Sequence, residues 1–145
     1  MGKVLAVCTS SIKGIQKTPV DKVDLQVDHG IVGDAHAGNW HRQVSILGQE
    51  SVDKLQDKLD FQLKPGDFAE NILTEGICVY KLPVGTRVQL GTALCEVTQI
   101  GKTCHYDCAI RQKAGDCVMP REGIFVKVLT PGTVRAGDEI NIVES

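Results

Sequence analysis

The segment from residue 101 to residue 121 contains the residue types best suited to chemistry. It holds three of the six cysteines, one of the four histidines and four basic residues. The thiolate is the reactive and metal-binding form of cysteine, and neighbouring cations favour it by lowering the thiol pKa. The segment carries a net charge of +2 within a chain of net charge −2, so we expect it to attract an anionic ligand. Its cysteines are Cys104, Cys108 and Cys117, and its basic residues are Lys102, Arg111, Lys113 and Arg121.

The spacing of these cysteines leaves two kinds of site open. In the first, one exposed thiolate is a nucleophile or a sulfur carrier, and the other two cysteines are resolving thiols or buried side chains. In the second, the three cysteines and His105 bind structural zinc, although their spacing is looser than the two close pairs usual in such sites. The remaining cysteines lie in apolar, strand-like contexts, where we expect buried thiols. They are Cys8, Cys78 and Cys95.

A second group of candidate residues lies in the loop between residues 28 and 42. His36, His41 and Arg42 accompany the only tryptophan, Trp40, and the glycines of the loop permit close approach of a ligand to the backbone. The loop therefore predicts part of a pocket for an anion or a flat heterocycle, whereas the histidine spacing is only weak support for a metal site. Trp40 either stacks on a ligand or covers the core, and we expect the core.

A third candidate segment runs from residue 64 to residue 76. Pro65-Gly66 predicts a turn, and Asp67 with Glu70 three residues later resembles an N-capping arrangement. Structure alone is sufficient to explain this pattern. The functional alternative is that backbone N–H groups of the turn and the side chain of Asn71 bind the polar edge of a ligand.

Short apolar stretches separated by glycines indicate that the elements carrying these residues are mainly β-strands. One stretch, from Glu50 to Leu59, has helical periodicity, with apolar residues on one face and Asp and Lys on the other. The stretch from Arg87 to Ile100 predicts two strands joined near Gly91-Thr92. The other predicted strands are Lys3–Thr9, Gln43–Leu47, Gly123–Leu129 and Gly137–Val143, and Pro131-Gly132 predicts a turn.

The bulk properties limit the class of protein. A chain of 145 residues without linkers or repeats predicts one domain, residues 1–145. The net charge of −2 and the lack of a basic run argue against nucleic acid as a partner. No stretch reaches the roughly 18 apolar residues of a membrane span, and no apolar leader is recognisable, so we expect a cytoplasmic protein with no membrane partner. Cysteines there normally stay reduced, so we do not expect disulfides.

Three segments in this order, GDAHAG, PGDFAENIL and the cysteine region followed by PREGIFVKVLTPGTVRAGDEI, resemble the MOSC domain, named after the C-terminal part of molybdenum-cofactor sulfurase. The likeness spans nearly the whole chain and is strongest to the small stand-alone bacterial members. The resemblance implies a mainly β fold, a MOSC-like β-barrel with a few short helices.

The family has one hallmark cysteine, which carries sulfur as a persulfide or ligates molybdenum in the pterin cofactor. Cys104 matches it best, with Thr103 in place of the proline that usually precedes it, and Cys108 and Cys117 rank second and third. The resemblance implies the molybdenum cofactor, molybdopterin, as the ligand, with the Asp67 to Asn71 turn at the pterin edge. The other predicted cofactor-binding residues are His36, Arg42, Lys102, Arg111 and Arg121.

These observations favour a protein that binds the molybdenum cofactor or carries sulfur for it. The expected partners are a cysteine desulfurase, which is a pyridoxal phosphate enzyme, or a protein of cofactor biosynthesis. The first alternative is a molybdenum-dependent reductase of N-hydroxylated compounds. That enzyme would need a separate electron donor, because the chain has neither a flavin-binding region nor an iron–sulfur cysteine pattern. The second alternative is a small structural zinc protein.

Overall fold

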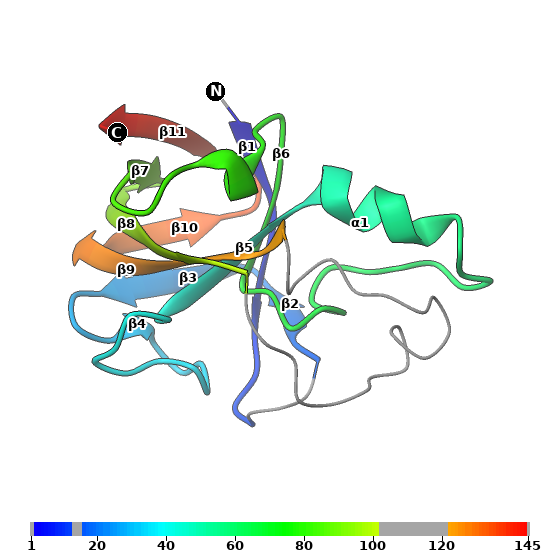
Figure 1. Ribbon diagram of the computed structural model, residues 1–145. Helices are drawn as coiled ribbons and strands as arrows, with labels where there is room; N and C mark the ends of the chain where they lie inside the picture. The colour runs from blue at the N-terminus through cyan, green and yellow to red at the C-terminus, as the bar shows by residue number, and fades with distance from the viewer. Residues whose placement is uncertain (1, 13–15, 102–121, 145) are drawn as a thin grey trace.

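The computed structural model describes residues 2–12, 16–101 and 122–144 (Figure 1). The helices that lie wholly within these residues are α1, Gln49–Gln56, and the short 3₁₀ helix η1, Val79–Lys81. The strands are β1 Gly2–Thr9, β2 Thr18–Val20, β3 Lys22–Gln26, β4 Gly30–Ile31, β5 Val44–Gly48, β6 Ile72–Glu75, β7 Arg87–Leu90, β8 Ala93–Ile100, β9 Ile124–Thr130, β10 Gly132–Arg135 and β11 Glu139–Glu144.

Seven strands form a closed barrel in the order β11, β7, β8, β9, β5, β6, β1, and the pairing of β1 with β11 completes the circle. The barrel strands pair antiparallel except β5 with β6, which are parallel and are joined through α1, as a parallel pair requires a crossover. Strand β2 extends the barrel sheet at β1, and β10, β3 and β4 form a small separate sheet. The predicted mainly β, barrel-like fold with few helices is therefore confirmed.

Alternating residues on the barrel strands face two different hydrophobic clusters, as the two-residue period of a strand dictates. Ile46 belongs to the larger cluster, to which strands all round the barrel contribute, whereas its neighbour Leu47 belongs to the smaller one. Ile124 and Phe125 divide in the same way. The smaller cluster lies between the barrel wall and the outer layer formed by α1 and the loop after it, from which Val52, Leu55, Leu63 and Phe68 are buried.

The predicted helix is present but shorter than expected, because it ends at Gln56 instead of Leu59. Lys58 and Leu59 form hydrogen bonds three residues back, to Leu55 and Gln56, so the last turn tightens. The side-chain oxygen of Gln56 also accepts the N–H of Leu63 at 2.8 Å, which ties the following loop back to the helix. No helix in the described residues has the length and apolarity needed to cross a membrane.

The strand stretches predicted from the sequence are confirmed as β1, β5, β7, β8, β9 and β11, whereas β2, β3, β4, β6 and β10 were not predicted. The interpretation of Pro131-Gly132 as a turn was wrong in detail, because only Pro131 separates β9 from β10, which begins at Gly132. The backbone passes so close to the β7–β8 turn there that a Cβ atom at residue 132 would lie 2.5 Å from the nitrogen of Ala93. Glycine at residue 132 permits this approach.

Candidate functional site

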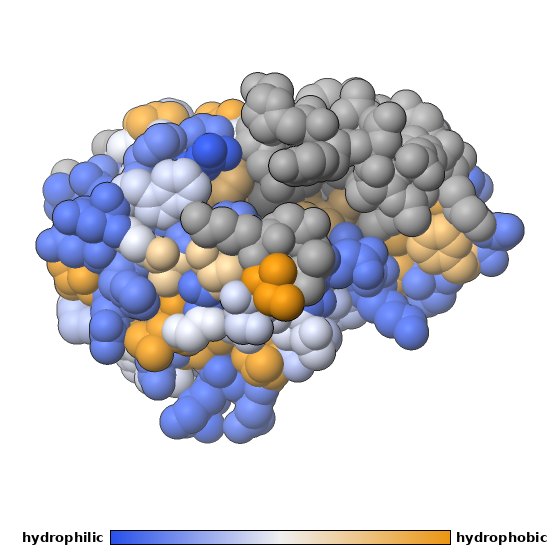
Figure 2. Space-filling view, turned by 90° about the horizontal axis from the view of Figure 1, so that it is seen from below, coloured by the Kyte–Doolittle hydropathy of each residue, from blue (hydrophilic) through white to orange (hydrophobic). Residues whose placement is uncertain are grey.

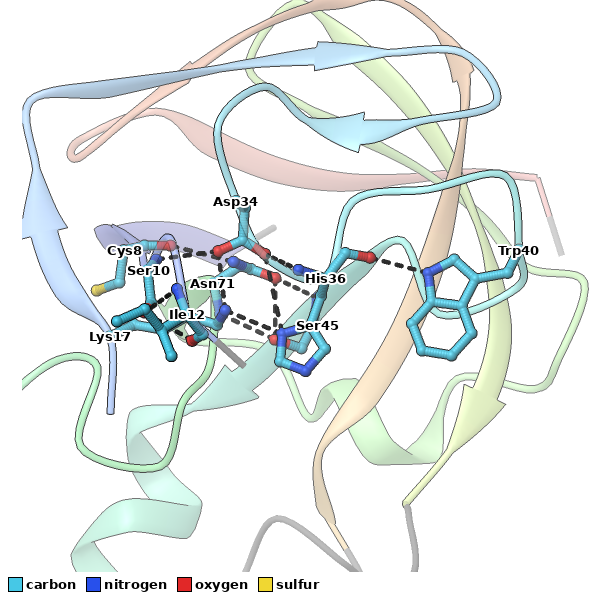
Figure 3. Close-up of polar contacts among 9 residues, drawn as sticks. All are labelled: Cys8, Ser10, Ile12, Lys17, Asp34, His36, Trp40, Ser45 and Asn71. Carbon is cyan, nitrogen blue, oxygen red and sulfur yellow. Dashed lines mark hydrogen bonds and ion pairs between the residues drawn. The ribbon is translucent and has the colours of Figure 1, made fainter. Parts of the chain in front are cut away.

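A buried polar cluster lies beyond the end of β1 (Figure 3). The ammonium of Lys17 is 2.8 Å from Oδ1 of Asp34, and the two side chains are only 1% and 0% exposed. The same ammonium lies 3.0 Å from Nδ1 of His36. The Asp34 carboxylate also accepts the backbone N–H groups of Ser10 and His36, both at 3.1 Å. These contacts join the loop after β1, the residue before β2 and the loop after β4.

The electrostatics of the cluster favour an ionised Asp34. Burial opposes ionisation, but the hydrogen bond and charge of Lys17, together with the N–H groups of Ser10 and His36, hold the pKa of Asp34 below its usual value. A charged pair buried this deeply requires each partner to be compensated. Asp34 is therefore a fixed negative charge that orients both Lys17 and the His36 backbone.

The turn at Gly66 holds the backbone of Lys17. The N–H of Lys17 donates to the carbonyl oxygen of Gly66 at 2.9 Å. Gly66 has φ of +89°, and a Cβ atom there would lie 2.1 Å from the carbonyl oxygen of Lys17, so only glycine fits. The predicted Pro65-Gly66 turn is thus present, and its backbone packs directly against the backbone of Lys17.

A row of five residues forms the base of the site, four of them on barrel strands and the fifth, Asn71, immediately before β6. The Cys8 N–H donates to the Asn71 carbonyl at 2.6 Å, and the Asn71 N–H donates to the Ser45 carbonyl at 3.1 Å. Ser45 is in register with Phe125, and Phe125 is in register with Gln99. The row brings the ends of β1 and β8 into one line, although they are distant in the sequence.

The 33–42 loop continues from the polar cluster onto this row. The indole N–H of Trp40 donates to the carbonyl oxygen of His36 at 2.8 Å. The guanidinium of Arg42 lies 4.9 Å from the centroid of the Trp40 ring and 5.5 Å from that of Phe125. The Nε atom of Arg42 is buried and has no hydrogen-bond partner in the described part of the chain. His41 contacts Gln99, with 2.9 Å between Nε2 and Oε1.

The expectation that Trp40 covers the core was wrong. Its side chain belongs to neither hydrophobic cluster and the residue is 36% exposed, with its indole fixed by His36 and its ring against Arg42. The loop is tied to the barrel by its polar contacts, so the ring stays at the surface.

Seen from below the orientation of Figure 1, hydrophilic and hydrophobic residues are interspersed over the described surface (Figure 2).

The cysteine-rich segment falls outside the described residues, and with it the predicted site residues Lys102, Cys104, Cys108, Arg111 and Arg121. The described residues beside it are well anchored. Gly101 donates its N–H to the carbonyl oxygen of Gly123 at 2.6 Å and accepts the side-chain amide of Gln99 at 2.8 Å. Gln99 is also the partner of His41. Gly101, the last described residue before residue 122, is therefore linked through Gln99 to His41, the neighbour of Trp40 and Arg42.

The Asp67 to Asn71 turn has a clear internal role. The amide of Asn71 is fully buried, with Oδ1 accepting the N–H and the hydroxyl of Ser45 and Nδ2 donating to the Cys8 carbonyl at 3.1 Å. Asp67, which is half-buried, accepts the Lys64 N–H at 2.8 Å. The N-capping interpretation was wrong because no helix follows, and Asp67 and Glu70 accept N–H groups of the turn itself. Whether Asp67 and Asn71 contact a cofactor stays a prediction.

The described cysteines differ in accessibility. Cys8 and Cys95 are fully buried as predicted, and burial raises the pKa of each thiol to about 12, helped at Cys8 by the charge of Glu70. Both therefore stay protonated and unreactive. The prediction for Cys78 was wrong, because it lies at the surface immediately before η1 and lines a pocket of about 200 Å³ beside α1.

The residues that the structure brings together suit an anionic, partly aromatic ligand better than a metal ion. The described part of the chain contains no group of three His, Cys, Asp or Glu side chains able to hold a metal. The Nε of Arg42, which has no partner among the described residues, is a hydrogen-bond donor, and the exposed Trp40 ring is a stacking surface. The pocket for an anion or a heterocycle that the sequence predicts at this loop stays a prediction.

Sequence reasoning selected His36 and Arg42 but did not select Lys17 or Asp34. Asp34 lies in the GDAHAG segment two residues before His36. An Asp at the start of a loop of small residues often accepts the backbone N–H two residues later, as Asp34 does from His36, and this pattern could have identified it. Lys17 has no such signal, because only the fold brings it to Asp34 and His36.

Comparison with known proteins agrees with this architecture. The crystal structure of the YuaD protein from Bacillus subtilis has a TM-score of 0.78 at 21% identity, covering 97% of this chain and 94% of that one. YiiM from Geobacillus stearothermophilus has a TM-score of 0.72 at 20% identity, over 99% of this chain and 76% of that one. YiiM from Escherichia coli has a TM-score of 0.72 at 21% identity, over 100% of this chain and 71% of that one. These likenesses show the fold. Among curated proteins, none matches the chain. Residues 33–141 match the MOSC domain, so the chain belongs to the MOSC domain family.

Proposed function

We propose that this protein binds the molybdenum cofactor, or carries sulfur for it, through Cys104. Membership of the MOSC domain family supports an association with this cofactor. The observation that carries the proposal is Arg42, whose buried Nε lacks a partner among the described residues while its guanidinium lies against Trp40. Molybdopterin combines an anionic phosphate with a flat pterin ring, so it matches a guanidinium beside an exposed indole.

Arg42 is suited to bind the phosphate because a buried N–H without a partner lacks a hydrogen bond that a phosphate oxygen can supply. Trp40 is suited to the ring, since about a third of its surface is open and its indole is fixed by His36. Stacking on a fixed ring costs little side-chain entropy. The two residues thus recognise different parts of one ligand.

The other predicted residues complete the proposal. His36 hydrogen-bonds the cofactor from the loop that holds Trp40, and Lys102, Arg111 and Arg121 offset its negative charge. Asp67 contacts the pterin edge, whereas Asn71 acts mainly by fixing the turn against β1 and β5, since its amide is already engaged. When bound, the cofactor supplies a molybdenum centre for redox chemistry or for receipt of sulfur.

Cys104 is the proposed thiolate, ahead of Cys108. It follows Gly101 by three residues, so its Cα lies within about 11 Å of the Gly101 Cα in any conformation. Gly101 is bonded to Gln99, which contacts His41 next to Arg42. A sulfur carrier here would receive its sulfur from a cysteine desulfurase, the pyridoxal phosphate partner predicted above.

The test is purification from a molybdenum-replete host that makes the cofactor. Molybdenum, tungsten and zinc are measured by elemental analysis, the pterin by fluorescence after oxidation, and bound sulfur by its release with cyanide. The variants are Cys104→Ala, Cys108→Ala, Cys117→Ala and Arg42→Gln, with Arg135→Gln as the matched control because Arg135 is exposed on β10.

We expect pterin in the wild type and in Arg135→Gln. Loss of a hydrogen bond to a charged group predicts roughly tenfold to hundredfold weaker binding for Arg42→Gln. We expect cyanide-labile sulfur or molybdenum to disappear only with Cys104→Ala. Wild-type protein with neither pterin, molybdenum nor labile sulfur contradicts the proposal. Stoichiometric zinc whose removal unfolds the domain identifies the structural zinc alternative. Molybdenum that turns over N-hydroxylated compounds with an added electron donor identifies the reductase.

A further inference from the structure

The burial of Lys17 calls for a functional explanation. Lysine is rarely buried, yet this side chain is 1% exposed and contacts two acceptors in the described residues, Oδ1 of Asp34 and Nδ1 of His36. A buried ion pair contributes little net stability, and apolar residues of similar volume often replace such a pair without loss. Net stability therefore does not by itself explain the pair, whereas a role of the Lys17 ammonium in orienting His36 does.

The contact between Lys17 and His36 has only one chemically sensible direction. An ammonium has three donors and no acceptor, so Nδ1 of His36 accepts and carries no proton. A neutral imidazole has one N–H, which must then be on Nε2. Figure 3 shows the second ring nitrogen of His36 directed away from Asp34 and Lys17. The ring thus has its acceptor nitrogen towards Lys17 and its N–H on the side of the ring away from Lys17.

Asp34 and the Gly66 turn keep Lys17 in this position. Asp34 is held by two backbone N–H groups, from Ser10 and His36, so its carboxylate cannot rotate freely. The Lys17 backbone is bonded to Gly66, where no side chain would fit. The His36 backbone is fixed twice, through its N–H to Asp34 and through its carbonyl to Trp40. The side chain and the main chain of His36 are therefore both oriented.

We propose that Lys17 is a positioning residue, held by Asp34, that fixes His36 as a neutral imidazole presenting Nε2–H as a hydrogen-bond donor to oxygen acceptors of the bound ligand. The ligand class follows from the proposed function, on which this part of the inference rests: an anionic compound with phosphate or carbonyl oxygens. The state of the imidazole itself is a property of the protein alone.

The experiment is a long-range proton–nitrogen correlation spectrum of protein labelled with ¹⁵N in its histidines, recorded at pH 7. The main variant is the pair Lys17→Met with Asp34→Asn, which removes both buried charges so that neither remains uncompensated. Lys17→Arg is the conservative variant, because a guanidinium also only donates. His41, which contacts Gln99 rather than Lys17, is the internal reference. Thermal unfolding and pterin content are measured on each protein.

In the wild type we expect His36 as a single Nε2–H tautomer, with Nδ1 at the chemical shift of a hydrogen-bonded acceptor. In the paired variant we expect the Nδ1 signal to move towards that of an unbonded nitrogen and both tautomers to appear, with pterin binding weaker by about tenfold or more. We expect the Lys17→Arg protein to retain the wild-type pattern of His36 signals. The His41 signals should stay unchanged in all of them.

Three results overturn the inference: an Nδ1–H tautomer in the wild type, a doubly protonated ring in the wild type, or a wild-type His36 pattern in the folded paired variant. If that variant does not fold, the wild-type spectrum and Lys17→Arg still decide the tautomer. A fixed Nε2–H tautomer in a protein that never contains pterin refutes the proposed cofactor and leaves the positioning role of Lys17 standing.

Discussion

Glu70 predicts an unusual dependence of stability on pH. Its side chain is 1% exposed and accepts the N–H groups of Gly66 at 2.9 Å and Phe68 at 3.1 Å. Burial raises the pKa of Glu70 from 4.5 to about 7, despite those N–H groups, and the charge of Asp67 raises it further. The carboxyl group thus binds its proton more tightly in the folded protein than in the unfolded chain.

The sign and size of the effect follow from linkage. Below pH 4.5 the group is protonated in both states and contributes no pH dependence. Between pH 4.5 and 7 the folded state retains a proton that the unfolded state has lost, so the free energy of unfolding falls as the pH rises. Each pH unit corresponds to about 1.4 kcal/mol, which gives a loss of roughly 3 kcal/mol that is complete above pH 7.

The assay compares wild type with Glu70→Gln by urea unfolding between pH 4.5 and 8. Glutamine does not titrate, and it has one acceptor oxygen for the two N–H groups, so the variant is less stable at pH 4.5 by about 1–3 kcal/mol. The stability of wild type relative to the variant should then decrease by roughly 3 kcal/mol on going to pH 8. Other titrating groups are common to both proteins and cancel in the difference. The control is Glu75→Gln, an exposed residue on β6.

A stability difference between wild type and Glu70→Gln that is constant across this range would refute the reasoning. It would mean that the two N–H groups compensate the burial of the carboxylate completely. A difference that grows with pH would reverse the sign and show a pKa below the ordinary value. The Glu75→Gln curve should run parallel to wild type in either case.

Two further predictions concern accessibility and backbone strain. Among the described cysteines we expect iodoacetamide to alkylate Cys78 in the native protein and to leave Cys8 and Cys95 unmodified until denaturant is added. Peptide mapping measures the modification of each cysteine. Modification of Cys8 or Cys95 in the native protein would contradict their burial. We expect Gly66→Ala to destabilise the protein more than Gly85→Ala in urea unfolding. Both positions have positive φ, at a cost of about 1–2 kcal/mol for alanine, but only at Gly66 would the new methyl group meet a carbonyl, that of Lys17. Equal losses would show that the Lys17 backbone yields.

The sequence was sufficient to predict the fold class and the strands with an apolar run of their own. β1, β5 and β9 are largely apolar because most of their residues are buried on both faces, whereas β8 alternates buried and half-buried residues. β6 was missed because it continues directly from a turn rich in polar residues and has only four residues. β3 alternates exposed polar residues with buried apolar ones, Val23 and Leu25, so the two-residue period of a strand is visible in its sequence although no strand was predicted there.

The candidate site was predictable only where its residues are near one another in the sequence. His36, Trp40 and Arg42 share one loop, so their proximity was expected. Lys17 is brought to Asp34 by the return of the chain after β1, and no local pattern reports such a contact. The position of Trp40 was misjudged because an aromatic residue is compatible with a core or with a surface, and only the hydrogen bond to His36 decides.

The closing seam between β1 and β11 has a consequence for synthesis of the protein. The seam joins Gly2 to Ile140 and Lys3 to Glu139, so nearly the whole chain must leave the ribosome before the barrel is complete. Until then β1 and β7 each have an open edge, and unpaired strand edges favour aggregation. Formation of the β1–β11 and β11–β7 pairings therefore removes two edges at which the incomplete barrel can associate with other chains.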